Sequence, residues 1–110
     1  MPSEEFVVVL TTFPAEGDAE AFATTLVTER LAACVNVLPP MRSIYMWKGV
    51  VERADERQLL IKTQTDRVRD LEVRIKALHP YDVPEFLVLA VLDGSRDYLF
   101  WVAESTRSHP

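Results

Sequence analysis

The fold is decided by a stretch in the middle of the chain, MRSIYMWKGVV at positions 41–51. Its side chains alternate in the way a strand requires, and Lys48-Gly49 suits a two-residue hairpin turn. Residues 58–63, QLLIKT, are typical of the returning strand. The polar stretch 52–57 between them fits a bulge, a loop or a solvated strand. A long central hairpin is therefore expected.

The residues before this hairpin predict a strand, a helix and a second strand. Residues 6–13 are an apolar, β-branched run, as expected of a central strand covered on both faces. Residues 19–31 carry apolar side chains at helical spacing, with Asp18 as the N-cap. Residues 34–38 alternate again, and the two prolines that follow end this strand.

The residues after the hairpin repeat the pattern. A second helix is expected up to residue 78, capped by Thr65 or Asp66, and residues 86–92 predict a second wholly apolar strand. Ser95 caps a short third helix. The order β-α-β-β-α-β plus a terminal helix predicts an α+β, ferredoxin-like sandwich. Right-handed crossovers would place the two apolar runs side by side in the middle of the sheet.

The length of the hairpin has a consequence for assembly. Two strands of ten or more residues span roughly 35 Å, whereas a compact chain of this length has a radius of gyration of about 13 Å. The hairpin should therefore overhang the domain and expose a sheet edge. A symmetric partner whose sheet the hairpin joins would cover that edge, which predicts a homo-oligomer.

Composition narrows the class of protein. The 110 residues, 48% hydrophobic and 26% charged, predict one folded domain. Seventeen acidic residues against twelve basic ones give a net charge of −5, which argues against a nucleic-acid partner. The start has no basic leader region, and no apolar run reaches a bilayer span. We therefore expect a soluble, cytoplasmic protein without a membrane partner.

Catalytic constellations are missing from the sequence. There is no G-x-S-x-G, no glycine-rich phosphate loop and no H-E-x-x-H. With three glycines scattered along the chain, a phosphate cradle of backbone amides is not expected. The sequence predicts that the protein is not an enzyme and requires no cofactor.

Three residues are candidates for metal chemistry. Cys34, the single cysteine, is a soft ligand of the kind that Cu(I) and Zn prefer, or else a small buried hydrophobe. His79 either caps the end of the second helix or ligates a metal. His109 is a terminal imidazole that can bind copper adventitiously.

Lys62 stands in an otherwise apolar strand end. Its ammonium needs a ligand or a carboxylate partner, or it extends to solvent along its aliphatic stem. The carboxylate candidates are Glu56, Asp82 and Glu85.

Four aromatic residues have two interpretations. They line a pocket at a subunit boundary, or they anchor a subunit interface. These residues are Tyr45, Trp47, Tyr98 and Trp101.

Several short motifs follow one another in a fixed order over nearly the whole chain, from about residue 6 to residue 103. The motifs are Ala33-Cys34-Val35-Asn36-Val37, then Ser43, Tyr45, Trp47 and Gly49, then Glu56-x-x-Leu59-x-x-Lys62-Thr63, His79-Pro80-Tyr81-x-Val83-Pro84-Glu85, Gly94, and Tyr98-Leu99-x-Trp101. In this order and spacing they resemble the CutA1 family of divalent-cation tolerance proteins.

The resemblance implies a tight homotrimer with an architecture similar to that of PII signalling proteins, in which long hairpins complete neighbouring sheets. It also implies a role in tolerance to divalent cations, especially copper. Cys34 and His79 would contact a copper ion, with Glu85 as an oxygen contact or as the partner of Lys62. An inter-subunit cleft would be lined by Tyr45, Trp47, Lys62, Tyr98 and Trp101.

An alternative from another class stays open. A PII-like regulatory or scaffold trimer would bind a small anionic ligand or a partner protein in its clefts, and its metal binding would be incidental. A third interpretation is a trimer that only stabilises or localises another protein.

Overall fold

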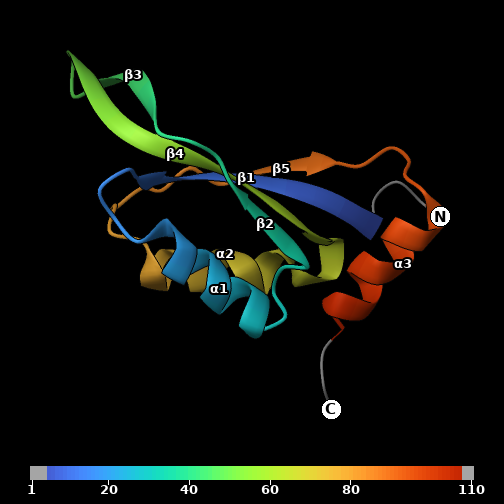
Figure 1. Cartoon of the computed structure of the whole chain (residues 1–110). Coiled ribbons are helices and arrows are strands. Elements are labelled where there is room, and N and C mark those ends of the chain that lie inside the picture. The colour runs from blue at the N-terminus through green and yellow to red at the C-terminus, as the bar shows by residue number, and fades with distance from the viewer. Residues whose placement is uncertain (1–4, 108–110) are drawn as a thin grey trace.

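One antiparallel sheet and three α-helices form the chain (Figure 1). The computed structural model describes residues 5–107. The elements are β1 (Phe6–Pro14), α1 (Ala19–Thr28), β2 (Cys34–Val37), β3 (Met41–Trp47), β4 (Val50–Gln64), the 3-10 turn η2 (Thr65–Arg67), α2 (Val68–Leu78), β5 (Leu87–Ala90) and α3 (Arg96–Ser105). The predicted order of strands and helices is confirmed.

The strand order is that of a ferredoxin-like sheet whose second strand is broken in two. The sheet runs β2-β4-β1-β5, and β3 pairs with the first half of β4. Every pairing is antiparallel. The ambiguous stretch 52–57 is continuous strand, because it pairs on one side with β3.

The β3–β4 hairpin projects from the body of the molecule, as predicted (Figure 1). The molecule measures 44 × 27 × 23 Å and its radius of gyration is 14.7 Å, above the value of about 13 Å for a compact chain of this length. At the tip, Lys48 has φ 51° and Gly49 has φ 79°. Two successive residues with positive φ are characteristic of the type I′ turn, whose twist matches that of the strands.

The last strand differs from its prediction. β5 pairs with β1, with Val8 opposite Leu89, but it lies at the edge of the sheet and not in the middle. Leu87 is 53% exposed and Leu89 is 49% exposed. An apolar run predicts burial on both faces, but a single chain provides β5 with a neighbour on one side only.

Helices cover only one face of the sheet. α1 and α2 lie together on that face, as Figure 1 shows, and pack on the odd-numbered side chains of β1. Their shared core includes Val9, Phe22, Leu26, Leu59, Ile61, Leu71 and Ile75. α3 packs at one end of the sheet through Val102, which contacts Phe6 and Ala33. The even-numbered side chains of β1, at Val8 and Leu10, stay half-buried on the opposite face, which we call the open face.

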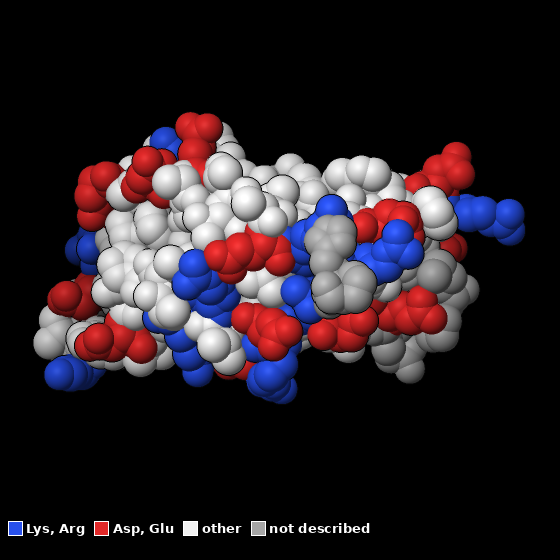
Figure 2. All heavy atoms as spheres, turned by 90° about the horizontal axis from the view of Figure 1, so that it is seen from below, with Lys and Arg blue, Asp and Glu red and all other residues white. Residues whose placement is uncertain are grey.

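On the helical side, the described residues carry charges of both signs. Figure 2 shows that side, with acidic and basic side chains interspersed. Arg74 of α2 donates two hydrogen bonds of 2.8 Å to the carboxylate of Glu29, just after α1. None of the helices among residues 5–107 is long and apolar enough to cross a membrane.

Two of the three predicted helix caps are confirmed. The Asp18 carboxylate accepts from the Ala21 N–H at 2.9 Å, and the Ser95 hydroxyl accepts from the Tyr98 N–H at 3.3 Å. The prediction for the second helix was wrong. Thr65 and Asp66 lie inside η2, which leads the chain from β4 into α2. A tight 3-10 turn at that point delays the start of the α-helix.

The end of α1 is held by a left-handed residue. The Leu31 N–H donates to the Leu26 carbonyl and the Arg30 N–H to the Val27 carbonyl, each at 3.0 Å. This is the Schellman pattern, in which glycine usually occupies the left-handed position. Here the position is Arg30, with φ 61°.

Replacing Arg30 therefore tests the backbone strain directly. Arg30→Ala keeps the left-handed Cβ and removes the long contact from Arg30 Nη1 to the Glu104 carbonyl, 3.5 Å away. Arg30→Gly removes the same contact together with the Cβ. We expect the glycine variant to exceed the alanine variant in stability by about 1 kcal/mol. Denaturant unfolding at one fixed protein concentration measures this, and equal midpoints would show that Arg30 is unstrained.

Candidate functional site

A pocket of about 960 Å³ lies beside the hairpin, and we call it the hairpin pocket. Its walls come from β3, from the outer half of β4 and from the segment 81–85. Tyr45 and Trp47 alternate on β3 and therefore share one face of that strand, and both line the pocket. Sites for small molecules commonly have a volume of this order.

A buried carboxylate lies in the wall of the hairpin pocket. Glu56 is 7% exposed, and its Oε2 accepts a hydrogen bond of 3.2 Å from the Thr12 hydroxyl. Burial, followed by hydrogen bonding toward Glu56 and the charge of Glu56, raises the pKa of Tyr81 to about 12. Tyr81 therefore remains a protonated donor at neutral pH.

A second carboxylate of the pocket is held by an amide. Gln58 Nε2 donates to Glu85 Oε2 at 2.9 Å and to the Thr11 carbonyl at 2.8 Å. The expected pairing of Glu85 with Lys62 is therefore not what the structure shows. Gln58 and Lys62 are four residues apart on β4, about 13 Å along the strand.

Lys62 has a different partner from those predicted. Its ammonium donates to the side-chain oxygen of Asn36, on the neighbouring strand β2, and not to Glu56, Asp82 or Glu85. β2 pairs with this end of β4, so its amide is the nearest acceptor.

His79 uses both of its ring nitrogens within the chain. It is 7% exposed, and Nε2 lies 2.6 Å from the Thr12 carbonyl, which can only accept, so Nε2 carries the proton. Nδ1 accepts from the Tyr81 N–H at 3.1 Å. The ring also packs edge-on against Phe13 and Phe22. The imidazole therefore ties α2 to β1 and does not cap the last carbonyls of its own helix.

Cys34 lies at the other end of the sheet. It is half-buried at the start of β2, opposite Lys62 in the register, and its side chain is on the open face because Val35 and Val37 pack on the helical core. Burial, with a smaller electrostatic contribution from Cys34, raises the pKa of Tyr98.

The predicted metal ligands are not brought together within one chain. Cys34 is on the open face, whereas His79 packs on Phe13 beneath the helix-covered face, and Glu85 bonds Gln58. Among residues 5–107, no three histidine, cysteine, aspartate or glutamate side chains lie close enough to hold a metal ion. His109 lies outside the described residues.

The predicted cleft residues divide into two groups. Tyr45 and Trp47 belong to the hairpin pocket, whereas Tyr98 and Trp101 stack on α3 with ring centroids 5.5 Å apart. Lys62 lies opposite Cys34, at the same end of the sheet as α3. From the sequence, Glu56 is expected only as a candidate partner of Lys62, and Tyr81 is not expected in a site. Glu56 and Tyr81 both belong to the motifs of the family resemblance, and that membership is the one feature of the sequence that could have indicated them.

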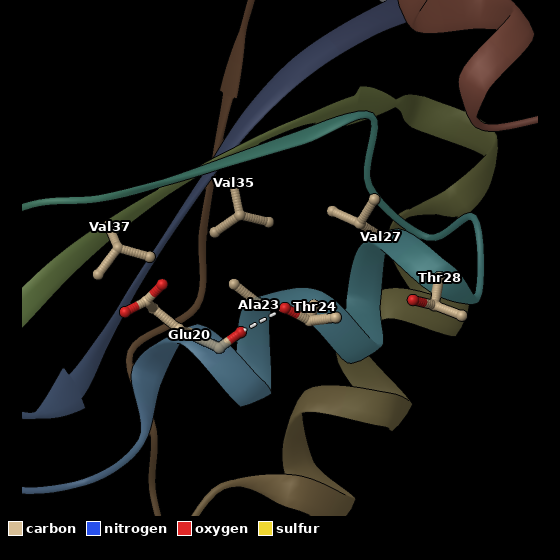
Figure 3. Close-up of a pocket in the computed structure, with 7 residues that line it drawn as sticks. All are labelled: Glu20, Ala23, Thr24, Val27, Thr28, Val35 and Val37. Carbon is tan, nitrogen blue, oxygen red and sulfur yellow. Dashed lines mark hydrogen bonds between the residues drawn. The ribbon is translucent and has the colours of Figure 1, made fainter.

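A smaller groove lies between α1 and β2. Its volume is about 300 Å³, and Figure 3 shows Val35 and Val37 of β2 directed toward α1. Thr24 turns its hydroxyl back to the Glu20 carbonyl at 2.7 Å, so this polar group is satisfied within the helix. The groove offers apolar surface and one exposed carboxylate, Glu20.

Comparison with known proteins gives consistent matches. A family model described as CutA1 divalent ion tolerance protein matches residues 7–105. A divalent-cation tolerance protein CutA of Thermus thermophilus is 50% identical over 99 residues, which cover 90% of this chain and 96% of that protein.

Solved structures agree with these matches. The crystal structure of CutA1 from Oryza sativa has a TM-score of 0.91 at 38% identity and covers 96% of each chain. A structure described as the periplasmic divalent cation tolerance protein CutA from Archaeoglobus fulgidus has a TM-score of 0.88 at 29% identity. That match covers 93% of this chain and 99% of that one.

The raised pKa of Tyr81 predicts a late step in the alkaline titration. An unfolded tyrosine loses its proton near pH 10, whereas folded Tyr81 keeps it until about pH 12. Its stabilising contribution is therefore complete below pH 10 and is lost as the pH rises toward 12. Tyrosinate absorbance of the native protein should show a component near pH 12 that is absent in Tyr81→Phe and retained in the control Tyr45→Phe. Its persistence in Tyr81→Phe would show that the late component does not come from Tyr81.

Proposed function

This chain belongs to the CutA1 divalent ion tolerance family, and from that premise we propose that it binds copper as a cytoplasmic homotrimer and so contributes to tolerance of metal ions. The observation that carries the proposal is the position of Cys34. Its thiol is half-buried, unpaired with another cysteine, and lies on the face of the sheet that the helices leave uncovered. Thiolate is the protein ligand that Cu(I) prefers.

One chain provides a Cu(I) ion with one soft ligand, the thiol of Cys34. His79 would ligate through Nδ1 only by giving up the Tyr81 amide, and Glu85 would do so while already accepting from Gln58. The proposal therefore ranks Cys34 first among the three contacts. The remaining ligands would come from other copies of the chain, because the open face of the sheet is where copies would meet.

The shape of the subunit supports assembly. Apolar side chains are exposed on the projecting hairpin and on the edge strand β5, and those of the open face are half-buried. Each of these surfaces would be covered by an apolar surface of another copy. A homotrimer meets this need in the proposal. Its location in the cytoplasm fits a free thiol, which is kept reduced there.

A second candidate function is favoured by the hairpin pocket. A regulatory or scaffold trimer of the PII-like kind would take a small ligand or a partner protein in clefts of this sort. The cavity of about 960 Å³ with aromatic walls supports this alternative. Metal binding would then be incidental.

A competition titration distinguishes copper binding from the second candidate function. Purified protein is titrated with Cu(I) under reducing conditions against a chelator of known affinity. The proposal predicts saturable binding at a fixed ratio to subunits, weakened roughly 100-fold in Cys34→Ser because oxygen is a poor ligand for Cu(I). Met46→Leu is the matched control, since it removes an exposed sulfur from the hairpin.

Two results would count against metal handling. Equal affinity of Cys34→Ser and the unsubstituted protein would remove Cys34 from the site. Unsaturable uptake by the unsubstituted protein would reject the metal proposal as a whole and leave the second candidate.

A further inference from the structure

The loop between β5 and α3 contains the one aspartate in the sequence that is followed by a glycine, Asp93-Gly94. Both residues are exposed, and neither belongs to a helix or a strand. Neither takes part in the copper site or the hairpin pocket. A glycine after an aspartate has a chemical consequence, because no Cβ at that position hinders the approach of its main-chain nitrogen to the preceding carboxyl group.

The geometry of the pair brings the two reacting groups together. The Gly94 N–H donates a hydrogen bond of 2.8 Å to Asp93 Oδ1. Since Oδ1 is bonded to Cγ, the amide nitrogen lies no more than about 4 Å from that carbon. Reacting atoms in a near-attack conformation are about 3–3.5 Å apart. The Asp93 side chain is therefore already turned toward the amide that would attack it.

No other contact in the described chain holds the two groups apart. Within residues 5–107, the Asp93 carboxylate forms no ion pair with a basic side chain. The Gly94 N–H donates to no main-chain carbonyl in that part of the chain. Neither group has to leave a stronger partner before it reacts.

From these observations we propose that Asp93-Gly94 is a site of spontaneous isomerisation of aspartate to isoaspartate. The Gly94 nitrogen forms a bond to Asp93 Cγ, and its proton leaves with the carboxyl OH as water, which gives a cyclic imide. Water then opens the ring. If the bond from the Asp93 main-chain carbonyl carbon to the nitrogen breaks, the product is isoaspartate; if the new bond breaks, aspartate returns. No oxidant or reductant is needed.

Both reacting groups belong to one loop of one chain. The reaction consumes and returns water and uses no group of another copy, so the proposal does not depend on which surfaces an assembly covers. Asp82 is the matched comparison within the chain. It is also exposed and outside the helices and strands, but Val83, a stiff β-branched residue, follows it.

Isomerisation would change the start of α3. Isoaspartate adds one carbon to the main chain directly before Gly94 and Ser95. The Ser95 hydroxyl caps α3 by accepting from the Tyr98 N–H, and Gly94 lies so close to Leu99 that a Cβ there would be 3.1 Å from Leu99 Cδ2. The position of the modification therefore links the age of the protein to the docking of its last helix.

Peptide mapping of the ageing protein tests the proposal. The assembled protein is warmed in mildly acidic buffer for several weeks, and isoaspartate is measured by resistance to aspartate-specific cleavage and by labelled methyl transfer from an isoaspartyl methyltransferase. We expect isoaspartate to form at position 93 at least about tenfold faster than at position 82. The rate should be no lower than in a free peptide of residues 90–97.

Three variants assign the signal. Asp93→Glu keeps the charge but requires a six-membered ring, which closes more slowly, and should remove the signal. Asp93→Asn reaches the same imide by losing ammonia and should produce isoaspartate faster, which also verifies the detection. Asp82→Glu is the matched control and should leave the signal at position 93 unchanged. Gly94 is kept in all three because a Cβ there would crowd Leu99.

Several results would overturn the proposal. Isoaspartate in the peptide but not in the native protein would mean that the loop holds the pair in an unreactive conformation. Equal rates at positions 93 and 82, or an unchanged signal in Asp93→Glu, would show that the geometry of Asp93-Gly94 is not the cause. Absence of isoaspartate from both the protein and the peptide, with a signal in Asp93→Asn, would reject the reaction itself.

Discussion

An apolar sheet with helices on only one face is the constraint on which the rest of this structure depends. The odd-numbered side chains of β1 are buried by α1 and α2, whereas Val8 and Leu10 face the side that the helices leave uncovered. β5 is wholly apolar and still lies at an edge. Exposure of each of these apolar surfaces to water is unfavourable, and covering it with another apolar surface lowers the free energy. The hairpin, the edge strand and the open face therefore favour assembly for the same physical reason.

The two regions of functional interest follow from this layout. Cys34, Lys62 and α3 gather where the open face meets the end of the sheet. The hairpin pocket is at the opposite end, and β1 connects it to the core. The Thr12 carbonyl holds His79 while the Thr12 hydroxyl bonds Glu56, so one residue links the helical layer to the pocket. A site supported by buried strands in this way is held rigidly.

Local patterns predicted the elements well because local chemistry decides them. Asp18 and Ser95 cap helices through their own following amides, and Lys48-Gly49 turns through its own dihedral angles. The cap of the second helix was a local prediction that was wrong, because η2 precedes α2. The other predictions that were wrong concern neighbours distant in sequence. β5 lies at the edge because a single chain places no strand beyond it, and Lys62 bonds Asn36 because β2 pairs with that end of β4. No periodicity could place Glu56 and Tyr81 together.

The molar mass in solution tests the central claim most directly. Light scattering of the purified protein at micromolar concentration should give three times the chain mass of 12.5 kDa, because in the proposed trimer three copies would cover the open faces and receive the hairpins. Leu89→Lys, which places a charge on the exposed edge strand, should shift the protein toward smaller species. A monomeric mass for the unsubstituted protein would contradict the account, since the uncovered sheet would then be stable in water by itself.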